Sequence, residues 1–150
     1  MRKQINSIFV YLFFIACWIF FFYFYPYHLH YKEQITLCVL QPDFLQTYLQ
    51  KPAFLTEICG DYLTQFFLWT GGGSSILTLT FVFTWLGLRI ALRKTGITSH
   101  VSLWALLPIV AEWALSCHLE YPLSMSLGLM CSVWAFSLST LSTSTHTRGI

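Results

Sequence analysis

Long apolar runs alternate with polar breaks along this chain, and four of the runs are long enough to cross a lipid bilayer. A spanning helix needs about 20 mostly apolar residues. The runs cover about residues 8–25, 74–92, 101–119 and 122–141. The first and the fourth hold no charged residue, the second holds Arg89 near its end, and the third holds Pro108 and Glu112. The pattern therefore predicts an all-α fold, a single membrane domain over residues 1–150 with four spanning helices.

The segment between the first two runs has a different pattern, in which apolar pairs recur every four residues. From Phe54 to Phe67, such pairs alternate with polar pairs, which places one apolar stripe on a helix. Pro52 suits the first turn of this helix, and a run of three glycines follows it. A shorter copy of the pattern begins at Asp43, a residue that favours the N-cap position. We predict amphipathic helices over about residues 43–50 and 53–69, which cover the bundle or lie in the headgroup region.

Basic residues are distributed unevenly along the chain. Arg2 and Lys3 precede the first predicted span, and Arg89, Arg93 and Lys94 lie at the end of the second. Residues 26–73 hold only Lys32 and Lys51, and the turn at residues 118–122 holds no Lys or Arg. Because cytoplasmic loops are enriched in Lys and Arg, we predict a multi-pass protein with both ends in the cytoplasm.

The first span admits a second interpretation, a secretory signal peptide. Residues 1–4 would form its charged start. Its apolar run is longer than the roughly 7–15 residues of a signal core, however, and no small-residue cleavage site follows it. These features favour an uncleaved anchor.

Composition excludes several classes of protein. Apolar residues make up 56% of the chain and charged residues only 9%, against about 25% in an ordinary soluble domain. A soluble globular protein and a disordered protein are both excluded on this ground. The net charge of +2 and the lack of a basic run argue against a nucleic-acid partner. The expected partners are the lipid bilayer and other membrane helices, including those of a second copy of the chain.

Glu112 is the most informative single residue, because it lies inside a predicted span. An ionised carboxylate at the centre of a membrane helix costs about 2.5–3.5 kcal/mol on insertion scales, so such residues usually face protein or a wet cavity. Pro108, one turn earlier, removes a backbone donor and leaves the Trp104 carbonyl free. Two interpretations of Glu112 remain: a proton or substrate site, and a protonated acid bonded to a neighbouring helix.

Other candidates lie in the segment between the first two spans. Glu57 and Asp61 share one helix face, where two carboxylates can hold a divalent cation or divide into an acid and a base. A solvated polar face is the simpler interpretation of this pair. His28 and His30, in a stretch that we expect to be extended, favour an aromatic interface belt over a metal site. Cys38 and Cys59 either pair, if this side is oxidising, or stay reduced with Cys59 in the apolar stripe.

Sequence motifs of known catalytic and cofactor sites are absent. The chain has no dinucleotide fingerprint, no His-Glu-x-x-His, no Gly-x-Ser-x-Gly and no Cys-x-x-Cys. We therefore expect no cofactor and no metal, and no catalytic residue is assigned.

Three segments carry a resemblance to a known family: Tyr-Pro-Tyr-His-Leu-His-Tyr-Lys-Glu-Gln from residue 25, Pro-Asp-Phe-Leu from residue 42 and Asp-Tyr-Leu-Thr-Gln-Phe-Phe from residue 61. Over about residues 1–140, the chain resembles the amino-terminal part of an uncharacterised family of multi-pass membrane proteins of Gram-negative bacteria, a domain of unknown function. Members of that family are several times longer. The resemblance implies the bacterial inner membrane and either an opening module of such a protein or a shortened relative, and it transfers no catalytic residue.

A weaker likeness is to the polyprenyl-phosphate-dependent membrane glycosyltransferases. These proteins also begin with a helix, followed by an outer loop with flat interfacial helices and functional carboxylates. The likeness implies that Glu33, Asp43, Glu57 or Asp61 has such a role. The chain departs from the pattern because no acidic pair follows the first span directly and because four helices are too few for that fold.

Two classes of function follow from these observations. The first is a non-enzymatic membrane module that assembles with other helices, as the N-terminal part of a larger membrane protein or as a separate unit. The second is a fragment or relative of a membrane transferase or transporter that uses the carboxylates of the outer loop or Glu112. The lack of a catalytic constellation favours the first class, and with it a protein that is not an enzyme.

Overall fold

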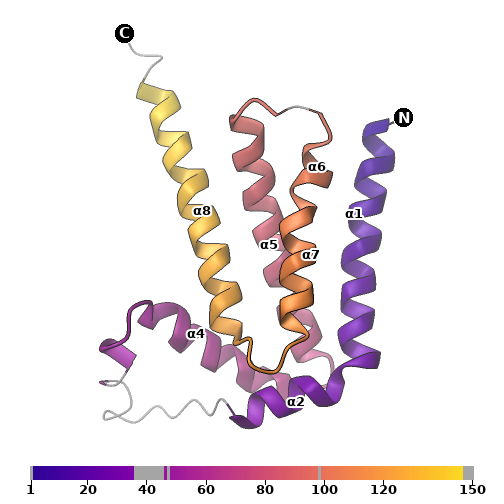
Figure 1. Cartoon of the computed structure of the whole chain (residues 1–150), viewed down its shortest axis with the longest axis vertical. Helices are drawn as coiled ribbons and strands as arrows, with labels where there is room; N and C mark the ends of the chain where they lie inside the picture. The colour runs from indigo at the N-terminus through magenta and orange to yellow at the C-terminus, as the bar shows by residue number, and fades with distance from the viewer. Residues whose placement is uncertain (1, 36–45, 47, 98, 147–150) are drawn as a thin grey trace.

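The structure of the chain is a computed structural model that describes residues 2–35, 46, 48–97 and 99–146. All regular elements in this part of the chain are helices, which confirms the predicted all-α class (Figure 1). Their bounds are α1 Arg2–Ile19, the π-helix η1 Phe20–Phe24, α2 Pro26–Ile35, α4 Phe54–Thr64, the 3-10 helix η2 Gln65–Leu68, α5 Gly72–Lys94, α6 Val101–Trp104, α7 Leu106–Ser116 and α8 Leu123–His146.

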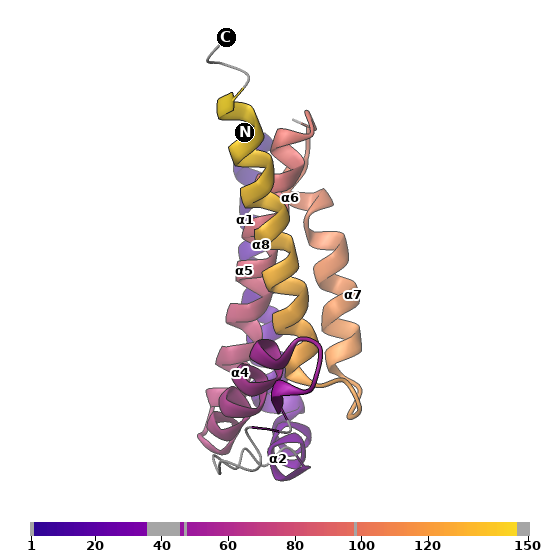
Figure 2. The same cartoon turned by 90° about the vertical axis from the view of Figure 1, so that its left-hand side faces the viewer.

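Helix α5 is the central element of the bundle. It contacts α1, α7 and α8, and Figure 2 shows α7 standing to one side of the layer that the other three form. Phe21, Phe81 and Ile109 are fully buried in the core between these helices. A Cβ atom at Gly87 would lie 2.8 Å from Val133 Cγ1, so a larger residue there would force the Val133 side chain of α8 to move. The Ser137 hydroxyl strengthens this contact by donating to the Gly87 carbonyl at 2.9 Å.

Two helices lie across one end of the bundle, α2 and α4 (Figure 1). Helix α4 packs against α8, and Gly60 is the point of closest approach. A Cβ atom at Gly60 would lie 2.8 Å from the backbone nitrogen of Ser124, which cannot move aside as a flexible side chain would. The long amphipathic helix that the sequence predicts at about residues 53–69 therefore exists as α4 and η2, and it covers the bundle.

The opposite end of the bundle holds the remaining chain reversals. The Arg2 end of α1, the His146 end of α8, the last residues of α5 and the start of α6 all lie there (Figure 1). This arrangement is an up-and-down path in which successive long helices run antiparallel.

Among the residues that the structure describes, two helices are long and apolar enough to cross a membrane, Asn6–Phe24 and Gly72–Lys94. Val101–Ser116 and Leu123–Ser139 are also apolar but shorter. The third predicted span is divided into α6 and α7 at Ala105, and it ends at Ser116. The division has a physical reason, because Pro108 has no N–H and leaves the Trp104 carbonyl without its usual helical donor.

The structure corrects one local expectation. The stretch around His28 and His30 is not extended but forms α2, with Pro26 at the first helical position, where its missing N–H costs nothing. Residues two apart on a helix point in different directions, so these two histidines do not converge. The predicted short helix at about residues 43–50 lies largely outside the described residues.

Candidate functional site

A cavity of about 390 Å³ lies at the end of the bundle that α2 and α4 cover. Its walls are mostly apolar, with Phe67 from η2 and Leu77 from α5 among them. Polar side chains also reach it, namely Lys32 from α2, Ser116 from the end of α7 and Ser126 from α8. An apolar cavity with a few convergent polar groups is the usual form of a ligand site in proteins.

Lys32 connects α2 to the turn between α7 and α8. Its side chain is buried, and Nζ donates to the carbonyl of Ser116 at 2.9 Å and to that of Tyr121 at 3.1 Å. Ser116 is the last residue of α7, so the ammonium group satisfies a carbonyl that the helix leaves without a donor and lies at the negative end of the helix dipole. Burial lowers the pKa of Lys32 to about 8, because it disfavours the charged form.

Glu112 lies inside the bundle, with only 2% of its surface exposed. The Ser126 hydroxyl is a polar neighbour of the Glu112 carboxyl, and Ser116 follows one helical turn later on the same face of α7. Both serines are also fully buried.

These three side chains share an unusual feature. In the part of the chain that the structure describes, neither oxygen of the Glu112 carboxyl and neither of the Ser116 and Ser126 hydroxyls forms a hydrogen bond of standard geometry. Buried polar atoms nearly always have a partner, because an unsatisfied one costs about 1–3 kcal/mol. Since Ser116 and Ser126 line the cavity, the cluster is placed to receive the polar group of a ligand or ordered water there.

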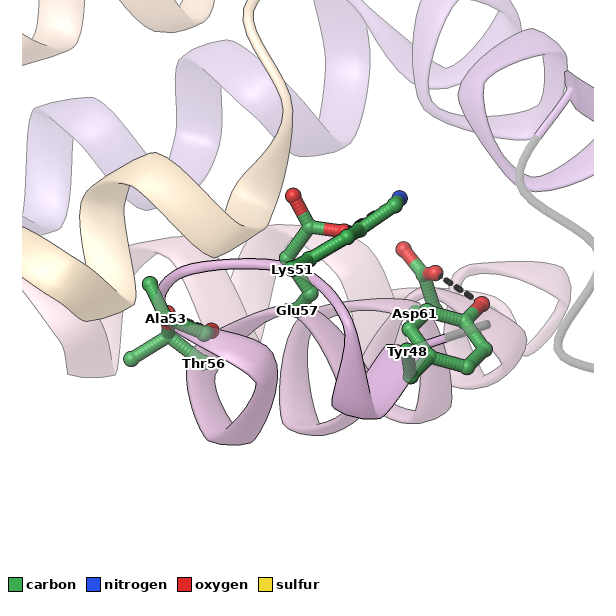
Figure 3. A network of polar contacts seen from close by, with 6 residues as sticks. All are labelled: Tyr48, Lys51, Ala53, Thr56, Glu57 and Asp61. Carbon is green, nitrogen blue, oxygen red and sulfur yellow. Dashed lines mark hydrogen bonds and ion pairs between the residues drawn. The ribbon is translucent and has the colours of Figure 1, made fainter. Parts of the chain in front are cut away.

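Glu57 and Asp61, the two carboxylates of α4, are bound by residues that precede this helix (Figure 3). Glu57 accepts from Lys51 Nζ at 2.6 Å, in a pair on the surface of the molecule. Asp61 accepts from the Tyr48 hydroxyl at 2.5 Å. The two carboxylates thus hold separate partners that tie the preceding turn to α4, and a joint role for them stays a prediction.

Most of the remaining predicted residues have no described side-chain environment. Glu33 belongs to α2, and its side chain is not described, while Asp43 and Cys38 lie outside the described residues. Cys59 is a free thiol on the exposed side of α4. Across residues 2–35, 46, 48–97 and 99–146, no group of three or more His, Cys, Asp or Glu side chains is arranged to hold a metal ion.

Lys32 is the residue of this site that sequence reasoning missed, since it served there only as evidence for orientation. The sequence does contain a feature that could have indicated this role, a single lysine in the aromatic segment that follows the first predicted span. A lysine near a membrane interface usually reaches toward water, however, and only the position of the α7–α8 turn shows that this one is buried.

Residues 1–150 match a family described only as a family of unknown function. The chain belongs to DUF6057. This result confirms the resemblance to an uncharacterised family. No curated protein and no solved structure matches this DUF6057 chain.

Proposed function

We propose that this DUF6057 chain is a multi-pass inner-membrane module that crosses the bilayer four times and assembles with other membrane helices. The observation that carries the proposal is the exposed apolar surface of its helices. Phe9 and Leu12 on α1 are 64% and 57% exposed, and Leu79 and Phe83 on α5 are 54% and 49% exposed. Soluble proteins rarely expose contiguous apolar faces of this kind, whereas acyl chains cover them at no cost.

The two shorter helices support the count of four spans. At about 1.5 Å per residue, Val101–Ser116 and Leu123–Ser139 reach about 24 Å and 26 Å, somewhat less than the roughly 30 Å thickness of the hydrocarbon core. Bilayers accommodate such short spans by local thinning. Helix α8 also continues to His146, which extends its reach.

The orientation follows from the arrangement of the ends. The end of the bundle that holds the start of α1, the end of α5 and the end of α8 also holds Arg93 and Lys94. The positive-inside rule assigns this end to the cytoplasm, and α2 and α4 to the outer side.

Assembly is supported by the exposed face of α8. Gly128, Ser132, Ala135 and Ser139 are spaced four, three and four residues apart, so they form one stripe along the helix. A Cβ atom at Gly128 would meet nothing within 4 Å. A groove of about 340 Å³ runs beside this stripe, between α5 and α8. Small residues let membrane helices approach closely, and they are enriched where such helices associate.

Crosslinking of the full chain in native membranes tests this assignment. Ala135→Leu places a bulky side chain on the stripe and is expected to reduce the crosslinked species several-fold. Leu138→Ile changes an exposed residue off the stripe and is the matched control. If Ala135→Leu and Leu138→Ile give equal yields of crosslinked species, assembly through this face is refuted.

The cavity at the outer end favours a second candidate, a fragment or relative of a membrane transferase or transporter. Its basis is the buried cluster of Glu112, Ser116 and Ser126 behind an opening at the end of the bundle. Ser126→Cys in a Cys117→Ser background tests access to this cluster. A small cationic methanethiosulfonate added outside intact cells is expected to modify Cys at position 126 if polar ligands enter from that side. Lack of reaction there, with labelling of the exposed Cys59 as the positive control, excludes this candidate.

A further inference from the structure

A second cavity, of about 440 Å³, lies at the opposite end of the bundle. Asn6 of α1, Arg89 and Arg93 of α5, and His100 and Ser102 at the start of α6 line it. Among its lining residues there is no Asp or Glu. Because three helices contribute donors and none contributes a carboxylate, the cavity has the electrostatic character of an anion site.

Arg89 and Arg93 are four residues apart, so both guanidinium groups lie on one face of α5. The Arg89 guanidinium lies 5.2 Å from the centroid of the Trp85 ring, an arrangement that holds its plane by a cation–π contact. Trp85 is itself fixed, because its indole nitrogen donates to the Ser102 carbonyl at 3.1 Å. Arg89 is therefore positioned before any ligand binds.

An unsatisfied donor points to a ligand at this place. Arg89 Nε is buried and, within the described residues, has no hydrogen-bond partner. A hydrogen bond fixes another part of the cavity wall. Asn6 Nδ2 and His100 Nδ1 lie 3.0 Å apart, and this contact joins the start of α1 to the start of α6. Arg89 lines the cavity, and the planar guanidinium group of an arginine can bind a phosphate through two parallel N–H donors.

We propose that this cavity binds the phosphate of an anionic phospholipid headgroup. A lipid is favoured over a free phosphate because exposed apolar residues, Phe9 and Leu12, continue α1 from Asn6 toward the middle of the bundle and offer a surface to the acyl chains. Basic cavities between membrane helices on the cytoplasmic side recognise anionic headgroups in this way. The assignment to the inner leaflet rests on the proposed orientation, and the binding itself does not.

Native mass spectrometry of the full chain, released from detergent with added lipid, tests the proposal. Phosphatidylglycerol is expected to stay bound at least tenfold more tightly than phosphatidylcholine. Arg89→Gln and Arg93→Gln are each expected to lower the affinity for phosphatidylglycerol about tenfold, as loss of one charge-assisted hydrogen bond does. Arg89→Lys keeps the positive charge but loses the paired N–H donors of the guanidinium group. Its loss of affinity for phosphatidylglycerol is expected to be smaller than that of Arg89→Gln.

Lys94→Gln is the matched control, because Lys94 follows Arg93, is exposed and does not line the cavity. Its effect on affinity is expected to stay below twofold. Equal binding of the two lipids, or an equal loss from Lys94→Gln and Arg93→Gln, overturns the proposal. Full displacement of phosphatidylglycerol by millimolar inorganic phosphate also overturns it, since the site then takes a free anion. A reversed orientation in cells, with the lipid preference retained in detergent, refutes only the choice of leaflet.

Discussion

At the scale of single residues, Glu112 combines nearly complete burial with a carboxyl group that forms no standard hydrogen bond to any residue the structure describes. A buried polar group without hydrogen bonds lowers the free energy of unfolding when no ligand is bound. Proteins tolerate this loss at sites that receive a ligand. Replacing an unsatisfied buried polar group with an apolar group of similar size is often neutral or stabilising.

We therefore expect Glu112→Leu to raise the thermal midpoint of the purified protein in detergent. A gain of about 1 kcal/mol corresponds to about 2–4 °C for a chain of this size. Glu112→Gln keeps the polar burial and is expected to leave the midpoint near that of the parent. A lower midpoint for Glu112→Leu would mean that the carboxyl holds the bundle together through Ser126.

Lys32 leads to a prediction about pH. Its pKa is about 8 in the folded protein, below the ordinary value of 10.5, because burial disfavours the ammonium form. Between these values the unfolded chain binds a proton that the folded chain has released, so stability rises with pH. The thermal midpoint of the parent is expected to rise between about pH 8 and about pH 10, and Lys32→Met is expected to flatten this rise.

Lys51→Met is the control for this measurement, since Lys51 is exposed and pairs with Glu57 on the surface, an interaction that raises its pKa. Its pH profile is expected to match that of the parent. A rise of equal slope in Lys32→Met would show that another group titrates in this range.

At the scale of elements, two glycines in helices have opposite surroundings. Gly60 of α4 contacts the backbone of Ser124 on α8, whereas Gly128 of α8 faces open space. We expect Gly60→Ala to lower the free energy of unfolding by about 1–3 kcal/mol, because the added methyl group pushes α4 away from α8. Gly128→Ala is expected to raise it by about 0.4–1 kcal/mol, because alanine restricts the unfolded chain.

Thermal unfolding in one detergent measures both variants. Limited proteolysis adds a local readout, since cleavage within α4 should accelerate in Gly60→Ala alone. If both variants unfold at the same midpoint, the close contact between α4 and α8 is not part of the folded state.

At the scale of the whole molecule, the proposed orientation leads to a labelling experiment. Lys51 and Thr95 are both exposed, and Lys51 precedes α4 whereas Thr95 follows α5. Helix α4 and the last residues of α5 lie at opposite ends of the bundle (Figure 1). In a variant without native cysteines, Lys51→Cys is expected to react with an impermeant maleimide added to intact cells. Thr95→Cys is expected to react only after the membrane is permeabilised. Labelling of both positions in intact cells would refute the four-span topology, and labelling of Thr95→Cys alone would invert it.

Sequence reasoning succeeded where the physical cause is local. The apolar runs at about residues 8–25 and 74–92 predict α1 and α5, because a mostly apolar run of about 20 residues has few alternatives to a buried or lipid-covered helix. The four-residue pattern from Phe54 predicts α4, because helical period and amphipathic pattern coincide. Helix α2 was missed, since its aromatic and imidazole residues have no helical period and only Pro26 marks its start.

The candidate sites depend on contacts between residues far apart in the sequence. The sequence by itself predicted that Glu112 is enclosed by protein, and the residue is buried in the bundle; the prediction was possible because the cost of a charge in hydrocarbon does not depend on which neighbours it has. Only the tertiary structure decided that Lys32 reaches Ser116 and Tyr121, and that Asn6 and His100 close the cavity beside Arg89. Segments more than 80 residues apart meet there because helices pack by shape along their whole length, and shape complementarity between distant helices leaves no periodic signal in the chain.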